Sequence, residues 1–266
     1  MKEWTRVTPE HPCPICRKPD WCGVLDNLVC CMRIQSQHQT KNGGWIHKLD
    51  EPQQRPAPPP NDKALLPATT AIAPMIEAWQ RTTSTTELRE LSEQLGVTPE
   101  SLDMLGAAWS FRHHAWAFPM TDIKVVGIRL RDKSGRKWAV TGSKQGLFIP
   151  RLPPPDDHLA MICEGPTDTA AALSLGFYAI GRPSCAGGED MAKRNLRRLN
   201  IWRIIICADN DPAGRTGAAR FAQETGLQYK IMSPLKKDLR AWLIAGATKE
   251  LVMCIINQQL WKGKHG

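Results

Sequence analysis

The sequence has no apolar run close to the roughly 18 residues that a membrane-spanning helix requires. The opening residues, MKEWTRVTPEHPC, also lack the apolar stretch of a secretory signal peptide. A GxxxxGK(S/T) phosphate loop is missing too, which excludes the usual nucleotide-hydrolysing motor within this sequence. We therefore expect a cytoplasmic protein with no membrane partner.

Acidic residues are the less frequent charged class, with 26 Asp and Glu against 35 Lys and Arg in 266 residues. The resulting net charge of +9 suits a polyanionic partner without identifying one. A hydrophobic fraction of 42% allows a real core, and the length predicts about two folded units.

A proline-rich segment follows the first 50 residues. Residues 51–60 read EPQQRPAPPP and show no apolar periodicity, which is typical of an extended spacer. We therefore predict a linker over residues 51–65 after an N-terminal module of residues 1–50. The alternative is a long surface loop within one domain.

The rest of the chain changes its pattern twice. Leucines at helical spacing and a Thr98-Pro99 start signal predict two short helices, and strand-like runs follow between residues 115 and 150. From residue 158 the strands HLAMIC, FYAIG, WRIIICA and QYKIM alternate with helices, which predicts a parallel sheet covered by helices. We expect KELVMCIINQQLW to form a further helix, packed on that sheet.

Cysteines are concentrated in the N-terminal module. Cys13 and Cys16 form a CxxC turn at the separation a tetrahedral zinc ion requires, and Cys31 lies at hairpin distance beyond it. A module of about 50 residues also needs a metal or another staple to fold. A cluster of buried free cysteines is the alternative. The usual second CxxC is missing, so the fourth ligand is one of Cys22, Cys30, His38 and His47.

Acidic residues follow two strands of the alternating region. HLAMIC ends on Glu164, with Asp168 four residues later, and WRIIICA is followed by Asp209 and Asp211. Parallel strands present their carboxyl ends at one edge of a sheet, so these carboxylates can share hard metal ions such as magnesium. The alternative is that the aspartates only cap turns.

EGPTD at 164–168 and DNDPAG at 209–214 resemble the paired signatures of the Toprim domain. That domain occurs in bacterial-type primases, type IA and II topoisomerases, some nucleases and a recombination mediator. The resemblance implies that Glu164 is catalytic, that Asp209 and Asp211 bind metal with it, and that Asp168 is a secondary acidic position. Lys237 resembles the basic residue of the pair that often closes the domain.

The order of the segments resembles DnaG-type and phage primases, because a zinc module and a mixed α/β segment precede the Toprim signatures. The resemblance implies an α/β fold: a zinc-ribbon-like β module, then a primase core with residues 66–156 as its N-terminal subdomain. Residues 157–245 would form a Rossmann-like Toprim domain, and residues 246–266 a C-terminal helix and basic tail.

The resemblance also implies site residues in these other segments. Basic side chains of the strand-rich stretch would bind nucleotide and template phosphates, together with Lys237; they are Arg129, Arg131, Lys137 and Lys144. In related zinc segments a Gly-Trp-x-His element recurs, here Gly44-Trp45-Ile46-His47, and this favours His47 as the fourth zinc ligand.

A primase of this kind would hold a structural zinc ion, use catalytic Mg²⁺ or Mn²⁺, and make short RNA primers from NTPs on single-stranded DNA in phage, plasmid or bacterial replication. Its helicase would be a separate protein. A Toprim nuclease and a non-catalytic single-stranded DNA-binding adaptor for a helicase are the alternatives. A topoisomerase is disfavoured, because the only tyrosines, Tyr178 and Tyr229, lie in strand-like segments.

Overall fold

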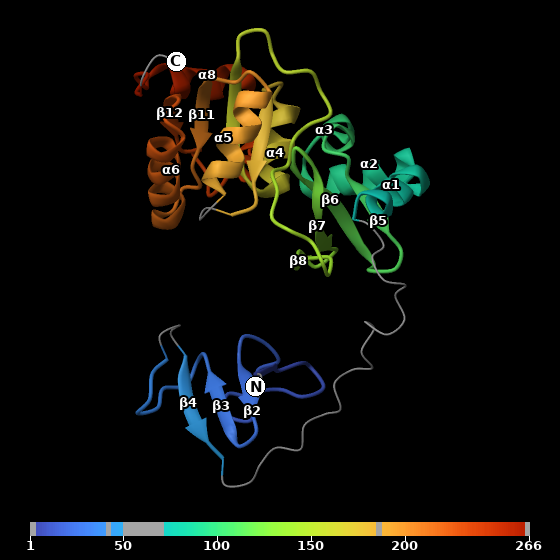
Figure 1. Ribbon diagram of the computed structural model, residues 1–266, viewed down its shortest axis with the longest axis vertical. Coiled ribbons are helices and arrows are strands. Elements are labelled where there is room, and N and C mark those ends of the chain that lie inside the picture. The colour runs from blue at the N-terminus through green and yellow to red at the C-terminus, as the bar shows by residue number, and fades with distance from the viewer. Residues whose placement is uncertain (1–3, 41–43, 50–71, 185–187, 264–266) are drawn as a thin grey trace. The chain divides into compact units, whose positions relative to one another are not determined.

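The computed structural model describes residues 4–40, 44–49, 72–184 and 188–263. The chain divides into two compact units, residues 1–69 and 70–266, coloured blue and green-to-red in Figure 1. The predicted linker, residues 51–65, lies outside the described residues, so the linker and its bounds stay predictions.

The first unit is an antiparallel sheet with strand order β1-β2-β3-β4. Its strands are β1 (Thr5–Arg6), β2 (Gly23–Leu25), β3 (Leu28–Cys31) and β4 (Trp45–Lys48). The buried residues of this unit are few and mostly cysteine: Val7, Cys13, Cys22, Val29 and Cys31. So small an apolar core contributes little stability unless a bound metal ion or a disulfide cross-links it.

The second unit begins with three helices, α1 (Ile72–Thr82), α2 (Thr85–Leu95) and α3 (Pro99–Met104). Ser84 and Glu87 form a reciprocal capping box at the start of α2, and Gly96 ends this helix in the left-handed conformation. Thr98 caps α3 ahead of its first-turn proline. These two helices agree with the prediction, whereas α1 was not expected.

An antiparallel meander follows, made of β5 (Ala108–Ser110), β6 (Ala115–Asp122), β7 (Lys124–Asp132) and β8 (Lys137–Ala139). One face of β7 packs Ile128 and Leu130 against α1. The opposite face carries Arg129 and Arg131, which lie opposite Phe118 and Trp116 of β6. Alternation along β7 therefore places its apolar residues on one face, which packs on α1, and its arginines on the other, called the basic face below.

The remaining residues form the predicted parallel sheet, with strand order β10-β9-β11-β12. Its strands are β9 (Leu159–Glu164), β10 (Ala179–Arg182), β11 (Arg203–Cys207) and β12 (Gln228–Met232). Because β10 and β11 lie on opposite sides of β9, the strand order reverses between β9 and β11. Crevices at such switch points, outside the carboxyl ends of the strands, are where open α/β sheets bind ligands.

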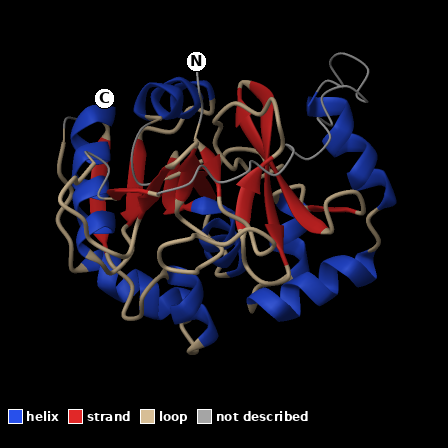
Figure 2. Cartoon of the chain, turned by 90° about the horizontal axis from the view of Figure 1, so that it is seen from below, coloured by secondary structure: helices blue, strands red, loops and turns tan. Residues whose placement is uncertain are grey.

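Helices cover both faces of this sheet, and Figure 2 shows them in blue around the red strands. One face packs against α4 (Gly165–Ser174), α7 (Leu239–Ile244) and α8 (Lys249–Asn257). The other packs against α5 (Glu189–Arg198) and α6 (Pro212–Thr225). Helix α6 begins directly after the acidic residues of its loop, because Asp211 caps it and Pro212 opens it.

Residues 147 and 148 join the two sheets of the second unit. The backbone of Leu147 pairs with Thr121 of β6, and the backbone of Phe148 pairs with Gly181 of β10. The last of the strand-like runs expected before residue 150 is therefore reduced to two successive bridges, at Leu147 and Phe148. A single buried cluster, which contains Phe118 and Phe148 as well as Cys163, runs through both parts.

The expected fold class is confirmed: a cysteine-rich β module precedes an α/β core with a parallel sheet. In the part of the chain that the structure describes, no helix has the length and apolar character needed to cross a membrane.

Candidate metal centres

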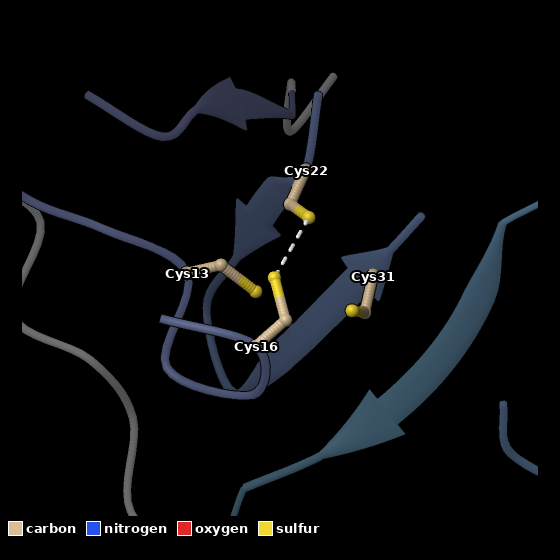
Figure 3. A group of neighbouring side chains, drawn as sticks. All are labelled: Cys13, Cys16, Cys22 and Cys31. Atoms are coloured by element: carbon tan, nitrogen blue, oxygen red, sulfur yellow. Dashed lines mark hydrogen bonds between the residues drawn. The ribbon is translucent and has the colours of Figure 1, made fainter. Parts of the chain in front are cut away.

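Four cysteine thiols converge in the first unit. The sulfur atoms of Cys13, Cys16, Cys22 and Cys31 all lie within 4.8 Å of one another, and Figure 3 shows them pointing toward a common centre. The Sγ atoms of Cys16 and Cys22 are 3.7 Å apart, close to the ~3.8 Å that a tetrahedral zinc ion with Zn–S bonds of about 2.3 Å imposes. The donor set fits structural zinc.

The fourth residue of this cluster is Cys22, not the favoured His47. His47 Nε2 lies 2.9 Å from the carbonyl oxygen of Ile34, which engages the ring nitrogen. Cys30, another candidate for the fourth ligand, pairs with Gly23 and Ile46 on the opposite face of the sheet from Cys31. The structure therefore favours Cys22, kept as an alternate, over the His47 that the Gly-Trp-x-His element indicated.

Neighbouring hydrogen-bond donors stabilise the cysteine sulfurs in their thiolate form. The backbone N–H groups of Met32 and Ile34 donate to the sulfurs of Cys22 and Cys31. The Arg33 guanidinium is held by Asp20 at 2.7 Å and lies 3.9 Å from two of the sulfurs. Burial raises the pKa of the Cys22 thiol to about 12, so its deprotonation at neutral pH requires a bound cation.

A second candidate centre lies at the carboxyl ends of β9 and β11. Glu164 is the last residue of β9 and immediately precedes α4. Gly165 has φ +69°, a left-handed conformation that lets the chain turn sharply there, and its Cβ position is open. Glu164 is thereby presented at the switch point of the sheet.

Asp209 and Asp211 occupy the loop between β11 and α6. Asp211 caps α6 by accepting a hydrogen bond from the Gly214 N–H at 2.7 Å. Gly214 packs so closely on Asp209 that a Cβ atom would lie 2.6 Å from its carbonyl oxygen, so the motif needs glycine there. The carbonyl of Lys237 accepts from the Asn210 N–H and ties the loop after β12 to this edge.

The carboxylates at this edge repel one another. Burial raises the pKa of Asp209 to about 6, and the charges of Glu164, Asp238 and Asp211 add to the increase. Burial also raises the pKa of Glu164. Within the described residues, only the cysteine cluster has three or more potential ligand atoms within 4.8 Å of one another. Oxygen donors that raise each other's pKa suit a divalent cation such as magnesium.

Asp168 differs from the other carboxylates because it is nearly buried. It has 8% of its surface exposed in the first turn of α4, and its Oδ1 accepts from the Arg240 N–H at 2.9 Å. Burial raises its pKa to about 7, against the lowering effect of that hydrogen bond. One of its oxygens thus holds the start of α7, and only the other is left for a metal.

Two predicted phosphate-binding residues come close to this acidic edge. Burial and the nearby Arg240 guanidinium lower the pKa of Arg131, while the Asp168 charge opposes the shift. Partial burial lowers the pKa of Lys137 as well, and the positive charge of Arg131 adds to the decrease, although much of this side chain remains exposed. Across β7 and β8 the two residues are direct partners.

The remaining predicted basic residues are placed differently. Arg129 reaches the carbonyl of Pro183, just beyond β10, at 3.5 Å, and its buried Nε has no hydrogen-bond partner. Lys237 is exposed, and its charge lowers the pKa of Asp209. Lys144 is exposed after β8, where its backbone N–H donates to the carbonyl oxygen of Val126. No sequence pattern singles out Arg182 or Arg240, because an isolated arginine carries no motif.

Residues 161–243 match the family described as Toprim-like, and the match contains the acidic edge in full. These residues form a Toprim-like domain. The resemblance inferred from EGPTD and DNDPAG is therefore confirmed for this part of the chain. The comparison with curated protein sequences found no significant match.

Solved structures extend the likeness beyond the Toprim-like domain. The zinc-binding and RNA polymerase domains of the Aquifex aeolicus primase match with a TM-score of 0.58 and 16% identity, over 72% of this chain and 61% of that chain. A DNA primase domain from Pseudomonas aeruginosa matches with a TM-score of 0.56 and 15% identity, over 73% and 80%.

A third match is to a bacteriophage T7 structure, in which lagging-strand DNA polymerase interacts with primase domains of two gp4 subunits bound to an RNA/DNA hybrid and dTTP. Its TM-score is 0.50 and its identity 17%, over 62% of this chain and 88% of that chain. At these identities the matches show a shared fold. The chain spans less than two thirds of the matched Aquifex chain.

The cysteine geometry predicts that Cys22→Ser abolishes zinc binding, whereas His47→Ala and Cys30→Ser retain about one zinc per chain. Zinc per purified chain is measured by mass spectrometry, and circular dichroism follows the folding of the module. Loss of zinc in His47→Ala, with retention in Cys22→Ser, would contradict the four-cysteine assignment.

Burial of Asp168 predicts that Asp168→Asn stabilises the second unit without divalent metal, increasingly as pH rises. The folded-state pKa of about 7 exceeds the ordinary 3.8, so the folded state binds more protons between these values and loses stability as pH increases. At pH 8 we expect a gain on the order of 3 kcal/mol, and almost none near pH 4. Thermal unfolding at several pH values tests it, with exposed Asp156→Asn as the pH-independent control.

Proposed function

We propose that the chain is a DNA primase that synthesises short RNA primers on single-stranded DNA in phage, plasmid or bacterial replication. The observation that carries the proposal is the placement of Glu164, Asp209 and Asp211 at the switch point of a Toprim-like sheet. The strand partners Arg131 and Lys137 of the antiparallel sheet lie close enough to Asp168 for their charges to interact, which supports the proposal. The fold shared with solved primases supports the same reading.

Glu164, Asp209 and Asp211 would hold Mg²⁺ or Mn²⁺, with Asp168 contributing through its second oxygen. The metal supplies activation of a 3′-hydroxyl and stabilisation of the departing pyrophosphate. The chain's basic side chains bind and orient the triphosphate and the template backbone. The residues proposed for this role are Arg129, Arg131, Lys137, Lys144 and Lys237.

The same carboxylates could serve phosphodiester cleavage, but the tyrosines oppose a topoisomerase. The Tyr178 hydroxyl is buried. Tyr229 pairs with Lys262 and lies near the amino end of β12, away from the acidic edge. Neither hydroxyl is placed to form a covalent link with DNA.

The proposal predicts that Asp209→Asn, alone or with Asp211→Asn, lowers primer synthesis at least ~100-fold, the scale of losing a catalytic metal ligand or charge stabiliser. Labelled NTP incorporation on a library of single-stranded templates is measured with Mg²⁺ and with Mn²⁺. Asp156→Asn, an exposed aspartate at the other end of β9, is the matched control.

Several results would contradict the assignment. Primer synthesis that survives the aspartate changes would place catalysis elsewhere. Metal-dependent cutting of DNA without NTPs would identify a nuclease, and binding without any incorporation would identify an adaptor.

The first unit offers a surface for the template. Across its strands Arg6, Gly23, Cys30 and Ile46 lie in one register, on the face opposite Cys31. This row lines an open groove of about 590 Å³, which Trp4 and Trp21 flank. Gly23 has no side chain to fill it.

The two tryptophans that flank this groove are exposed. Trp4 exposes 45% of its surface and Trp21 68%. Aromatic faces next to a cation are typical of proteins that stack unpaired bases. We assign the groove to single-stranded DNA, with Arg6 close to a phosphate.

Removing either aromatic face should weaken DNA binding without affecting zinc content. Trp4→Ala and Trp21→Ala are each expected to cost about 1–3 kcal/mol, the usual value of one base stacked on an aromatic ring. Fluorescence anisotropy with a labelled single strand measures this in the full chain. Trp202→Ala, which removes an equally exposed tryptophan from the second unit, is the control. Equal affinity in all variants would exclude the groove.

The remaining partners follow from the proposed activity. NTPs would be the substrates, and a replicative helicase would be a partner. The T7 match concerns primase domains of gp4 bound to an RNA/DNA hybrid and dTTP, which supports a nucleic-acid and nucleotide site in this fold.

A further inference from the structure

A buried arginine lies beside Glu164 at the acidic edge. Arg182 is the last residue of β10 and is the direct strand partner of Glu164 in β9. Paired residues of parallel strands point to the same face, here the face covered by α6. Both side chains line a small cavity at the carboxyl ends of the strands, together with Ala208 and Ala218.

The Arg182 side chain is fixed by its surroundings. Only 3% of its surface is exposed. Its Nε and Nη2 atoms both donate to the carbonyl oxygen of Ser184, at 3.3 and 3.0 Å. Its guanidinium lies over the Phe221 ring of α6, 4.5 Å from the ring centre. A cation–π contact and two hydrogen bonds thus hold one permanent positive charge in place.

We propose that Arg182 is a positioning residue for the acidic edge, one that orients Glu164 and offsets the repulsion among its carboxylates. Its burial keeps it from binding substrate phosphates, unlike the exposed Lys144 and Lys237. As the strand partner of Glu164, Arg182 places its positive charge next to the carboxylates of this edge.

This role has a specific consequence for divalent metal, and it rests on the proposed function of Glu164, Asp209 and Asp211 as metal ligands. A fixed cation beside a divalent-metal site weakens metal affinity. Removing it should therefore tighten binding, while Glu164 loses the neighbour that orients it. Tighter metal binding combined with slower turnover distinguishes this role from simple structural support, because a loss of structural support would weaken both metal binding and turnover.

The test is Mn²⁺ binding to the zinc-loaded full chain without nucleic acid, followed by the electron paramagnetic resonance signal of free Mn²⁺. Arg182→Gln is expected to bind at least roughly tenfold tighter, the effect of removing one charge about 6 Å from a divalent ion even at the dielectric constant of bulk water, about 80. Arg220→Gln is the matched control, since Arg220 is a neighbour of Phe221 on α6 but half-exposed and paired with Glu189. It should bind Mn²⁺ within about twofold of the unaltered chain, because solvent screens its charge.

A second variant keeps the charge and removes the guanidinium fork. Arg182→Lys should retain the unaltered Mn²⁺ affinity within about twofold, because the charge remains. Its primer synthesis should fall, because an ammonium cannot make the same pair of hydrogen bonds and stack on Phe221. This variant also serves where Arg182→Gln does not fold.

The outcomes distinguish the inference from the proposed function. Unchanged or weaker Mn²⁺ binding by folded Arg182→Gln would overturn the inference, as would tighter binding or full primer synthesis by Arg182→Lys. If Asp209→Asn binds Mn²⁺ like the unaltered chain, the metal site itself is misassigned and the proposed function fails.

Discussion

Repulsion among carboxylates at the switch point of the parallel sheet is the constraint on which the core depends. Glu164 and Asp209 are partly buried, and Asp168 is almost wholly so. The fold places hydrogen-bond donors of helix N-termini against these groups. The Gly214 N–H of α6 serves Asp211, and the Arg240 N–H of α7 serves Asp168. Helix starts stabilise negative charge, so the connections from β11 to α6 and from β12 to α7 offset part of the cost of the site.

The antiparallel sheet offsets the negative charge of the acidic edge in another way, with basic side chains. Alternation along β7 sends its apolar residues toward α1 and sends Arg129 and Arg131 to the opposite face. Residues 147 and 148 then pair with β6 and β10 in turn, which fixes the two sheets to each other. The basic face and the acidic edge are thus fixed by backbone hydrogen bonds. Positive side chains held in this way need no large rearrangement to meet a polyanionic ligand.

Much of the core could be predicted from the sequence because buried parallel strands and strand-end acids are local patterns. These local patterns predict the strands WRIIICA and HLAMIC and the positions of Glu164 and Asp209. The start of α6 does not follow from spacing, because Asp211 is both a candidate metal ligand and the residue that caps the helix. Arg182 was missed because its role depends on a strand partner and on Phe221, which the sequence separates widely.

Prediction from the sequence is limited in a similar way in the zinc module, where adjacent residues have different positions. Cys30 and Cys31 are adjacent in β3, yet alternation sends Cys31 to the cysteine cluster and Cys30 to the groove flanked by Trp4 and Trp21. Spacing alone cannot distinguish them, because a shift of one residue in register would exchange the two sulfurs. The four-cysteine cluster selects one register, and that register places Arg6, Gly23 and Ile46 in a row on the other face. Metal ligation and the shape of the groove are therefore consequences of the same strand pairing.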